Sequence, residues 1–406
     1  MTARANQNET HASSVLSETM GKPTTHFDEL DIALIRDIPS IEDEWRRLER
    51  REWNSLNQGL DWCRAWTAAH QSDLLAITGS IGSRILFLLP LEIVEDQLGR
   101  IARLPGGRFN NINTGLFDEA LAAPKANEIR QFKADLARSL RGVADLVVID
   151  GVPLDWKGTT HPLSDLASIE NQNHSFQLPL FGTMEATLAQ VNAKARRKKY
   201  RVQVRRLEAI GGFDYIVAQT VEEQHTLLER FFAQKSERLK AFGLPDVFAP
   251  APTRDFLHRL LDASQHGQDK PLAMHAIRLN GEHDGHIAAV TGLSRKDGHV
   301  LCQFSSIDDS VGADASPGEL LFWLAIERSI GEGATLFDFG IGDQPYKRSW
   351  CSQETVQHDV LLPVSTKGSM LAYLHLTKTG IKTAIKRNHR LYAIAQRWRS
   401  RQGGLD

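Results

Sequence analysis

The segment from Ser316 to Trp350 contains the strongest candidates for ligand-binding and catalytic residues in this sequence. Its first residues predict a helix start, with Ser316 as the N-cap, Pro317 at the first helical position and Glu319 completing a capping box. Free N–H groups at a helix start bind anions, and Gly318 lets a ligand approach the backbone closely. The pattern predicts a site that suits a pyrophosphate group, although the same residues also fit a simple helix cap.

Polar side chains follow the strand that comes next in the sequence. We expect the helix to end near Ile330 and a strand to cover 335–339. A carboxylate near a cleft can serve as a general base, and a tyrosine can donate a proton. Each can equally cap a helix, pair with a neighbouring cation or pack in the core. The candidates for chemistry are Asp338, Asp343 and Tyr346, with Lys347 beside them.

Three strands are expected upstream, over 272–279, 286–294 and 299–307, with turn signals between them. A meander, a phosphate-type loop, a helix, a strand and a short helix in this order resemble the GNAT acyltransferase fold. The pattern SPG, LL and FDFGIGD, followed by Tyr346-Lys347 and Trp350, resembles the CelD-like GNAT family associated with bacterial cellulose and exopolysaccharide synthesis. The likeness covers about 185–360 well and the first half loosely.

The resemblance implies a function for several of these residues. It implies acetyl-CoA, or another acyl-CoA, as co-substrate and no metal ion. Tyr346 would protonate the departing thiolate, as a tyrosine at this place often does in GNAT enzymes, and either carboxylate would act as base or orient the acceptor. Amides near the strand 300–307 would polarise the thioester carbonyl. The implied cofactor-binding residues are Gly312, Ser316, Pro317, Gly318 and Ser306.

The first half repeats this order of elements in a weaker form. The expected elements are helices over 41–48 and 60–69, strands over 74–78, 85–92 and 101–104, a loop rich in Gly and Asn over 106–115, a helix over 126–140 and a strand over 145–149. No SPG-type start precedes the last helix. The arrangement resembles the FemABX-like tandem transferases, so this half is expected to have lost acyl-CoA binding and to shape the acceptor cleft.

The expected fold is therefore α/β (α+β), with two tandem GNAT-like domains. Each domain is a mixed, mostly antiparallel sheet flanked by helices. The expected divisions are a disordered tail (1–26), a degenerate GNAT-like domain (27–184), an acyltransferase domain (185–363) and a basic helical segment (364–406).

A basic segment joins the two halves. Eight of the thirteen residues from Lys194 to Arg206 are Lys or Arg. Such a run is commonly a solvated helix face, but its side chains could instead contact phosphates of CoA, of a nucleotide-linked sugar or of transfer RNA. The residues assigned to phosphate or acceptor contacts are Lys194, Arg197, Lys198, Arg201 and Lys347.

The C-terminal segment is also basic. From Val360 to Leu405 there are nine Lys or Arg and no Asp or Glu. Apolar residues fall at helical intervals, so the segment is expected to dock on the protein's own core, or to contact an anionic membrane or a polysaccharide synthase. These apolar residues are Leu371, Leu374, Ile381, Ile385, Leu391, Ile394 and Trp398.

Length and composition fit a soluble enzyme with two domains. The 406 residues suffice for two cores, and a net charge of −2 gives no general bias toward nucleic acid. Cys63, Cys302 and Cys351 lack metal-ligand spacing, and their odd number argues against a secreted disulfide scaffold. The chain start lacks an apolar signal-peptide region, and no run reaches transmembrane length. We expect a cytoplasmic location, which includes the inner face of the membrane.

The expected function is transfer of an acyl group, acetyl in the first instance, from acyl-CoA to an amine or hydroxyl of a carbohydrate-related acceptor. No specific nucleic acid is expected as a partner. Two alternatives stay open: an aminoacyl-tRNA-dependent peptidyl transferase of the FemABX type, and a non-catalytic GNAT-like module that scaffolds a polysaccharide synthase. His275 and His286 are further candidates for the base, although each could be a satisfied core histidine.

Overall fold

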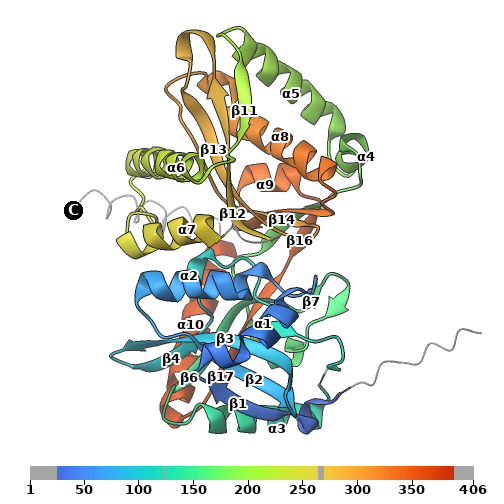
Figure 1. Ribbon diagram of the computed structural model, residues 1–406, viewed down its shortest axis with the longest axis vertical. Coiled ribbons are helices and arrows are strands. Elements are labelled where there is room, and N and C mark those ends of the chain that lie inside the picture. The colour runs from blue at the N-terminus through green and yellow to red at the C-terminus, as the bar shows by residue number, and fades with distance from the viewer. Residues whose placement is uncertain (1–24, 123, 264–268, 388–406) are drawn as a thin grey trace, which may run out of the picture.

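The structure is a computed structural model that describes residues 25–122, 124–263 and 269–387. It contains two large mixed sheets, one in each half of the molecule, and helices pack on both (Figure 1). The expected N-terminal tail lies almost wholly outside the described residues, as do Leu391, Ile394 and Trp398 of the C-terminal segment.

The first sheet is formed mainly by the N-terminal half. The strands of this sheet and the helices of the same domain are β1 (Asp31–Ile35), α1 (Glu42–Glu49), α2 (Leu60–His70), β2 (Leu75–Ile81), β3 (Arg84–Asp96), β4 (Gly99–Arg103), β5 (Leu116–Phe117), α3 (Ala126–Ser139), β6 (Leu146–Pro153), β9 (Ala167–Glu170), β17 (Gln357–Pro363) and α10 (Thr366–Arg387). The strand order is β1-β2-β3-β4-β6-β17-β9, and β5 pairs with β3. A small hairpin, β7 (Asp155–Trp156) and β8 (Thr159–Thr160), lies outside the sheet.

The second sheet is formed by the C-terminal half. Its elements are β10 (Ser175–Pro179), α4 (Met184–Leu188), α5 (Ala193–Glu208), β11 (Phe213–Val217), α6 (Val221–Ala241), α7 (Ala251–Ala263), β12 (Lys270–Leu279), β13 (Ile287–Lys296), β14 (His299–Ile307), α8 (Pro317–Gly331), β15 (Leu336–Ile341), α9 (Pro345–Trp350) and β16 (Gln353–Thr355). The strand order is β11-β12-β13-β14-β15-β10-β16.

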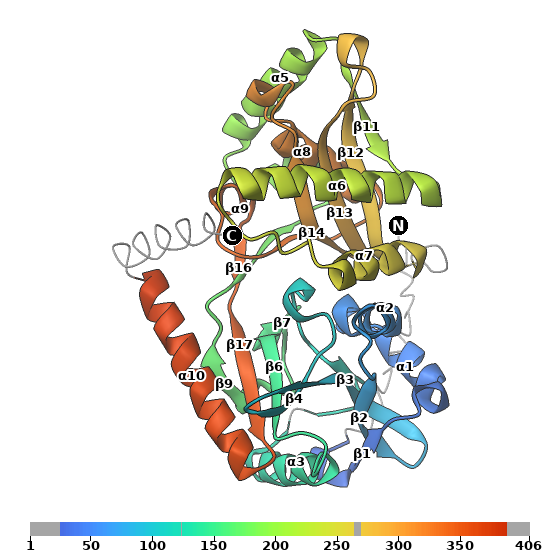
Figure 2. The same ribbon diagram turned by 90° about the vertical axis from the view of Figure 1, so that its left-hand side faces the viewer.

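Both faces of the second sheet are covered by helices, which requires apolar residues on both sides of its strands. On β12, Met274 and Ala276 belong to the apolar cluster under α6 and α7. The alternate residues Ile277 and Leu279 belong to the cluster under α5 and α8. Figure 2 shows α6 on one side of this sheet and α8 on the other.

The two halves share one topological feature. In each sheet a single parallel pair, β4–β6 or β14–β15, lies among antiparallel neighbours, and one long helix, α3 or α8, connects the two parallel strands. The predicted α/β fold with two related units is confirmed. The predicted meander also appears, as β12, β13 and β14, with ends within two residues of the expected ones.

The sheets divide the chain differently from the expected boundaries at 184 and 363. Strand β10 precedes residue 184 but pairs with β15 in the second sheet. Strand β17 lies at the end of the expected second domain (185–363) but pairs with β6 and β9 in the first sheet. The chain therefore crosses between the sheets twice. Each sheet contains one strand from a segment that the expected boundaries assign to the other domain.

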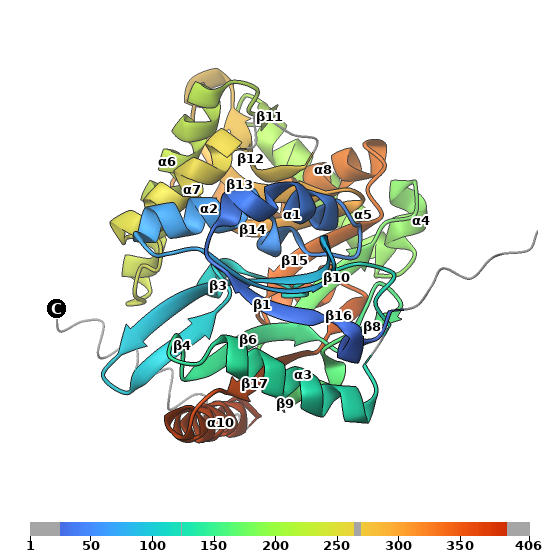
Figure 3. The ribbon, with the colours of Figure 1, turned by 60° about the horizontal axis from the view of Figure 1, so that its bottom comes forward.

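Helix α10 docks on the first sheet, against β6 and β17 (Figure 3). Its inner residues Leu371 and Ala372 pack on Leu146 and Leu361. On the other face of the sheet, α3 packs on the alternate residues of the same strands. For the described residues, the expectation that the C-terminal segment packs on the protein's own core agrees with the structure.

Gly368 allows α10 to approach β6 closely. A Cβ atom at this position would lie 1.7 Å from the carbonyl oxygen of Asp145. We predict that Gly368→Ala lowers the free energy of unfolding by about 1–3 kcal/mol, because the helix must move away from the sheet. Urea unfolding followed by circular dichroism measures this change.

Gly380, in the same helix, is the matched control, since a Cβ there would meet nothing within 4 Å. Gly380→Ala should leave the stability unchanged or raise it by up to about 1 kcal/mol. Equal unfolding midpoints for the two variants would contradict the described docking of α10.

Candidate active site

The gap between β14 and β15 is the central feature of the second domain. The strands pair in parallel at only three positions, from His299 opposite Leu336 to Leu301 opposite Asp338. On its β13 side, β14 carries a bulge that inserts Gln303 between the paired residues Cys302 and Phe304. Beyond these positions the two strands are not paired, and the region between residues 302–307 of β14 and 339–341 of β15 is called the gap below.

Asn111 of the first domain reaches this gap. Its side-chain oxygen accepts a hydrogen bond from the Ile341 amide (3.0 Å), and its side-chain nitrogen donates to Gln303 Oε1 (3.1 Å). A Cβ on Gly340 would lie 2.5 Å from Asn111 Oδ1, and Gly340 has a φ of +73°. The Gly- and Asn-rich loop at 106–115 is therefore part of the site, a role that the sequence did not predict for any single residue of it.

Tyr346 lies beside the gap, at the start of α9. Its ring is stacked against Phe322 of α8 (centroids 5.5 Å apart) and lies edge-on to Phe339 of β15 (6.1 Å). Burial raises the pKa of Tyr346, so the phenol stays protonated at neutral pH. Within the described residues its hydroxyl has no hydrogen-bond partner, which leaves the proton available to a ligand.

The predicted capping box at the start of α8 is wrong. Ser316 is left-handed (φ 51°, ψ 60°), and its side chain caps no N–H group. An N-cap serine normally has an extended backbone, so this turn cannot present its hydroxyl to the helix. Gly312 is also left-handed (φ 66°) and opens a short 3-10 helix, Ala313–Ala315.

The loop instead offers free backbone N–H groups. Within the part of the chain that the structure describes, the amides of Val311, Gly312, Ala313, Asp314 and Gly318 have no hydrogen-bond partner. Consecutive amides in a turn, followed by a helix N-terminus, form a concave site for an anion. The anion site stays a prediction, and the donors available to it are backbone groups rather than the serine side chain.

Helix α5 lies across the start of α8 and balances the charge of Glu319. Arg196 reaches one Glu319 carboxylate oxygen at 3.1 Å, and Lys199 reaches the other at 2.6 Å. Arg196 is buried, with its guanidinium 3.9 Å from the ring of Trp350. Two cations contact the single carboxylate of Glu319, so this residue does not give the start of α8 a net negative charge.

Two further side chains of α5 hold the loop itself. Gln203 donates to the Ser316 carbonyl oxygen (3.3 Å), and Arg206 donates to the Asp314 carbonyl oxygen. The sequence pattern predicted no individual role for Arg196, Lys199 or Arg206. Arg196, Lys199, Gln203 and the buried Leu207 recur at intervals of three and four residues, and Arg206 follows Gln203 by three. This spacing places the basic side chains on the inner side of the helix, and the signal was available in the sequence.

The basic residues that were assigned to phosphate or acceptor contacts lie elsewhere on α5. Lys194, Lys198 and Arg201 are exposed, and Arg197 lies 3.7 Å from Glu185. The structure does not bring these four side chains to the loop, so their assigned contacts stay a prediction.

Asp338 is completely buried in the centre of the second sheet. It accepts hydrogen bonds from the Gly340 amide (2.7 Å), Gln177 Nε2 (3.1 Å) and Ser175 Oγ (3.2 Å), and His299 Nε2 lies 3.4 Å away. These contacts fix the end of β15 and its junction with β10. Its surroundings suit a positioning residue better than a base that must reach a substrate.

Asp343 and Lys347 lie on either side of the α9 start. Asp343 is exposed and forms a two-point ion pair with Arg348 (2.5 and 2.7 Å). Lys347 is buried and donates to the carbonyl oxygens of Ile341 (2.7 Å) and Gly340 (3.1 Å), and burial lowers its pKa. Lys347 therefore supports the wall of the gap instead of projecting toward an acceptor.

Ser306 faces α6, on the side of the sheet opposite α8. Its hydroxyl donates to Gln234 Oε1 (2.7 Å), and its side chain is buried. The structure does not bring this hydroxyl to the loop at the start of α8. A cofactor contact through Ser306 would have to use its backbone.

The two histidines considered as bases are also apart from the gap. His275 is hydrogen-bonded to the Tyr215 hydroxyl (2.7 Å), and burial lowers its pKa to about 3. It lines a cavity of about 480 Å³ together with Arg328 and Glu332, at the C-terminal end of α8. The loop lies at the other end of this 15-residue helix, roughly 20 Å away. His286 lies 3.6 Å from Asp308.

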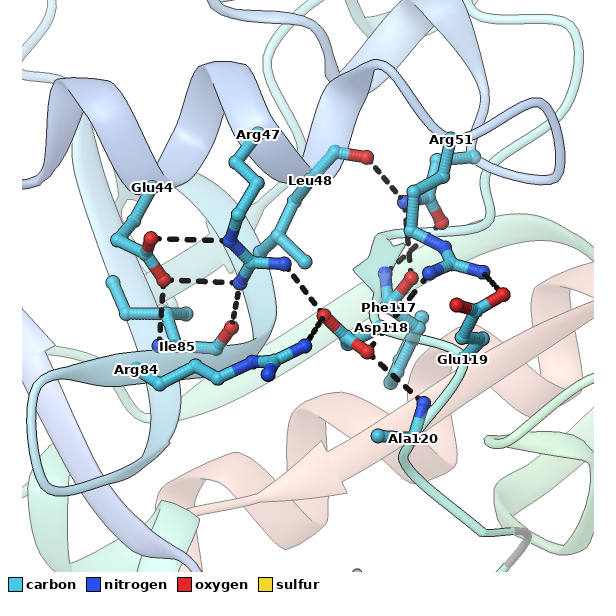
Figure 4. A network of polar contacts seen from close by, with 11 residues as sticks. Glu44, Arg47, Leu48, Arg51, Arg84, Ile85, Phe117, Asp118, Glu119 and Ala120 are labelled. Carbon is cyan, nitrogen blue, oxygen red and sulfur yellow. Dashed lines mark hydrogen bonds and ion pairs between the residues drawn. The ribbon is translucent and has the colours of Figure 1, made fainter. Parts of the chain in front are cut away.

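The first domain has a buried carboxylate, but it is structural. Figure 4 shows Asp118 between Arg47 (2.5 Å) and Arg84 (3.1 Å), with the Ala120 amide at 3.0 Å. Burial alone would raise the pKa of Asp118, but these donors together hold it below its usual value. The network fastens α1 to β3 and leaves no free acid or base. Among the described residues, no group of three or more metal-ligating side chains could hold a metal ion.

The charge at the start of α8 can be tested with inorganic pyrophosphate as the probe. We predict that Lys199→Gln weakens pyrophosphate binding about tenfold at physiological ionic strength, because one of the two cations near the loop is lost. Isothermal titration calorimetry measures the affinity. Lys198→Gln removes the same charge from the exposed neighbour and should change the affinity little, since salt screens it. Equal weakening by the two variants would contradict the described site.

Comparisons with known proteins found a similar domain and similar folds. Residues 194–348 match the family described as an acetyltransferase (GNAT) domain. The comparison with curated proteins gave no match. The crystal structure of FemX is similar over 80% of this chain and 94% of that chain, with a TM-score of 0.55 at 10% identity.

Two other solved structures resemble the chain more loosely. The L-PGS of Bacillus licheniformis has a TM-score of 0.46 at 10% identity, over 84% of this chain and 97% of that chain. A tandem GNAT protein from the clavulanic acid biosynthesis pathway has a TM-score of 0.45 at 11% identity, over 83% and 99%. At such identity the likeness to FemX shows a shared fold. The chain thus has the two-domain fold of FemX, and its residues 194–348 are similar to a GNAT acetyltransferase domain.

Proposed function

We propose that the second domain transfers an acyl group, acetyl in the simplest case, from acyl-CoA to an amine or hydroxyl. The observation that carries this proposal is the run of free amides from Val311 to Asp314, together with Gly318, beside the gap between β14 and β15. The amides suit the pyrophosphate of CoA. The gap suits its extended pantetheine arm, which can bond to the edge of β14 as a peptide would.

The proposed transfer is direct. The acceptor nucleophile attacks the thioester carbonyl carbon, the C–S bond then breaks, and the Tyr346 hydroxyl gives its proton to the departing thiolate. Amides at the Gln303 bulge would stabilise the oxyanion. A covalent acyl-enzyme intermediate on Cys351 is disfavoured, because burial raises the pKa of this thiol and keeps it neutral.

We propose that Asp343 is the general base that accepts the proton of the acceptor nucleophile. It is the exposed one of the two predicted carboxylates, and it lies on the turn between β15 and α9. Asp338 is given a positioning role, because the contacts around its buried carboxylate hold the turn at Gly340.

The proposed acceptor is a carbohydrate-related molecule in cellulose or exopolysaccharide biosynthesis. Two observations support this choice of acceptor. The sequence resembles the CelD-like family, and Asn111 of the first domain lies at the gap, where the first domain would shape the acceptor side. We place the enzyme in the cytoplasm, where acyl-CoA is found. The three cysteines are free thiols, as expected in a reducing compartment.

A FemABX-type transfer from aminoacyl-tRNA is the second candidate. The exposed basic face of α5, with Lys194, Lys198 and Arg201, favours it, because transfer RNA would be held by its phosphates. A non-catalytic module that scaffolds a polysaccharide synthase is a third reading. The three readings differ in what binds: acyl-CoA, transfer RNA, or neither.

Calorimetry with acetyl-CoA tests the leading proposal. Gly318→Trp would not be a clean probe, because even a Cβ on Gly318 would lie 2.6 Å from the Ile307 side chain. Ala313 is exposed within the loop. We predict that Ala313→Glu abolishes measurable acetyl-CoA binding through repulsion of the pyrophosphate, whereas the neutral Ala313→Gln retains it. Saturable transfer-RNA binding without acetyl-CoA binding would favour the second candidate instead.

Tyr346→Phe tests the proposed acid. Because the ring stays packed between Phe322 and Phe339, acetyl-CoA should bind with unchanged affinity, whereas kcat should fall by about 10²–10⁴-fold. Transfer assays with a panel of amino- and hydroxyl-bearing sugars would measure kcat. An unchanged kcat in a variant with normal binding would remove Tyr346 from the mechanism.

A further inference from the structure

Helix α10 has an apolar face that points away from the protein. Its inner face is accounted for by the packing of Leu371 and Ala372 and by the contact of His375 with Asp359 (2.9 Å). On the outer face, four large apolar side chains are between 44% and 69% exposed. They are Met370, Tyr373, Leu374 and Ile381.

These residues form one stripe. At 3.6 residues per turn, the intervals of three, four and seven between them place all four within a quarter to a third of the helix circumference. Contiguous exposed apolar surface of this kind is uncommon on a soluble monomer and marks an interaction site.

Lysines flank the stripe on one side. Lys367, Lys378 and Lys382 are exposed, and the same helical geometry places them between the apolar stripe and the buried face. No acidic residue occurs in α10, although the chain as a whole carries a net charge of −2. The positive charge is thus concentrated beside the apolar stripe.

The outer face of α10 has the chemistry of a helix that lies in a membrane surface. An apolar stripe inserts below the headgroups, and neighbouring lysines meet anionic phosphates. Among the described helices, none is long and apolar enough to cross a bilayer. We propose that α10 binds the surface of an anionic bilayer through Met370, Tyr373, Leu374 and Ile381, with the three lysines at the lipid phosphates.

The position of α10 permits this contact without blocking the candidate active site. The helix packs on β17, β6, β4 and β9, which all belong to the first sheet. Figure 2 shows it along the outer side of the first domain, away from α8 and α9. The proposal does not depend on the identity of the transferred group, so it can fail while the acyltransferase proposal stands.

Sedimentation with vesicles tests the proposal on the full chain. The vesicles are phosphatidylcholine alone, or an equal mixture of phosphatidylcholine and phosphatidylglycerol. We predict binding to the mixed vesicles only, weakened by salt. The triple variant Met370→Ser, Leu374→Ser, Ile381→Ser should bind at least tenfold more weakly, and Lys378→Gln with Lys382→Gln on the order of tenfold or more. Removal of the whole helix is avoided, because it would uncover Leu146 and Leu361.

Matched controls change similar side chains elsewhere. Phe242→Ser with Leu244→Ser removes exposed apolar residues after α6, and Lys133→Gln with Lys240→Gln removes two exposed lysines. Both should bind vesicles like the natural chain, and thermal unfolding confirms that each variant folds. Absence of vesicle binding would overturn the proposal. So would a dimer that the triple serine variant dissociates without any loss of vesicle binding, since a second copy would then cover the stripe.

Discussion

The short parallel pairing of β14 with β15 is the constraint on which the second domain depends. Three paired positions hold the strands together, and beyond them, at the Gln303 bulge and the turn at Gly340, the strands are no longer paired. The gap persists because buried groups hold its walls: Asp338 fixes the Gly340 amide, and Lys347 binds the carbonyl oxygens of Gly340 and Ile341. The first domain adds Asn111 to the same wall, so residues of both domains line the gap.

The charge balance at the start of α8 follows from helix packing. A loop with free amides attracts an anion only if no nearby carboxylate opposes it. Glu319 would be such a carboxylate, but Arg196 and Lys199 neutralise it from α5. The basic helix thus has two separate surfaces. Its inner residues balance the charge of Glu319 and bind the carbonyl oxygens of the loop. Its outer lysines face solvent, where a second polyanion could bind.

Local patterns in the sequence predicted the elements of the second domain well. Apolar residues recur at clear intervals in the meander, in α8 and in the strand before α9, and the structure contains these elements at the expected places. The pairing of β10 with β15 and of β17 with β6 could not be predicted, because such contacts join residues far apart in the chain. The same reason hides Asn111. The capping box failed because a left-handed Ser316 is a property of the whole loop, which no single residue type signals.

Amide hydrogen exchange with and without acetyl-CoA reports directly on the backbone N–H groups that we propose as ligands of the pyrophosphate. We expect slower exchange at Val311–Asp314 and Gly318 and along the edge of β14 that faces the gap, with no change in the first-domain strands β1 and β2. Unchanged exchange in the loop at saturating acetyl-CoA, or protection confined to the first domain, would contradict this proposal.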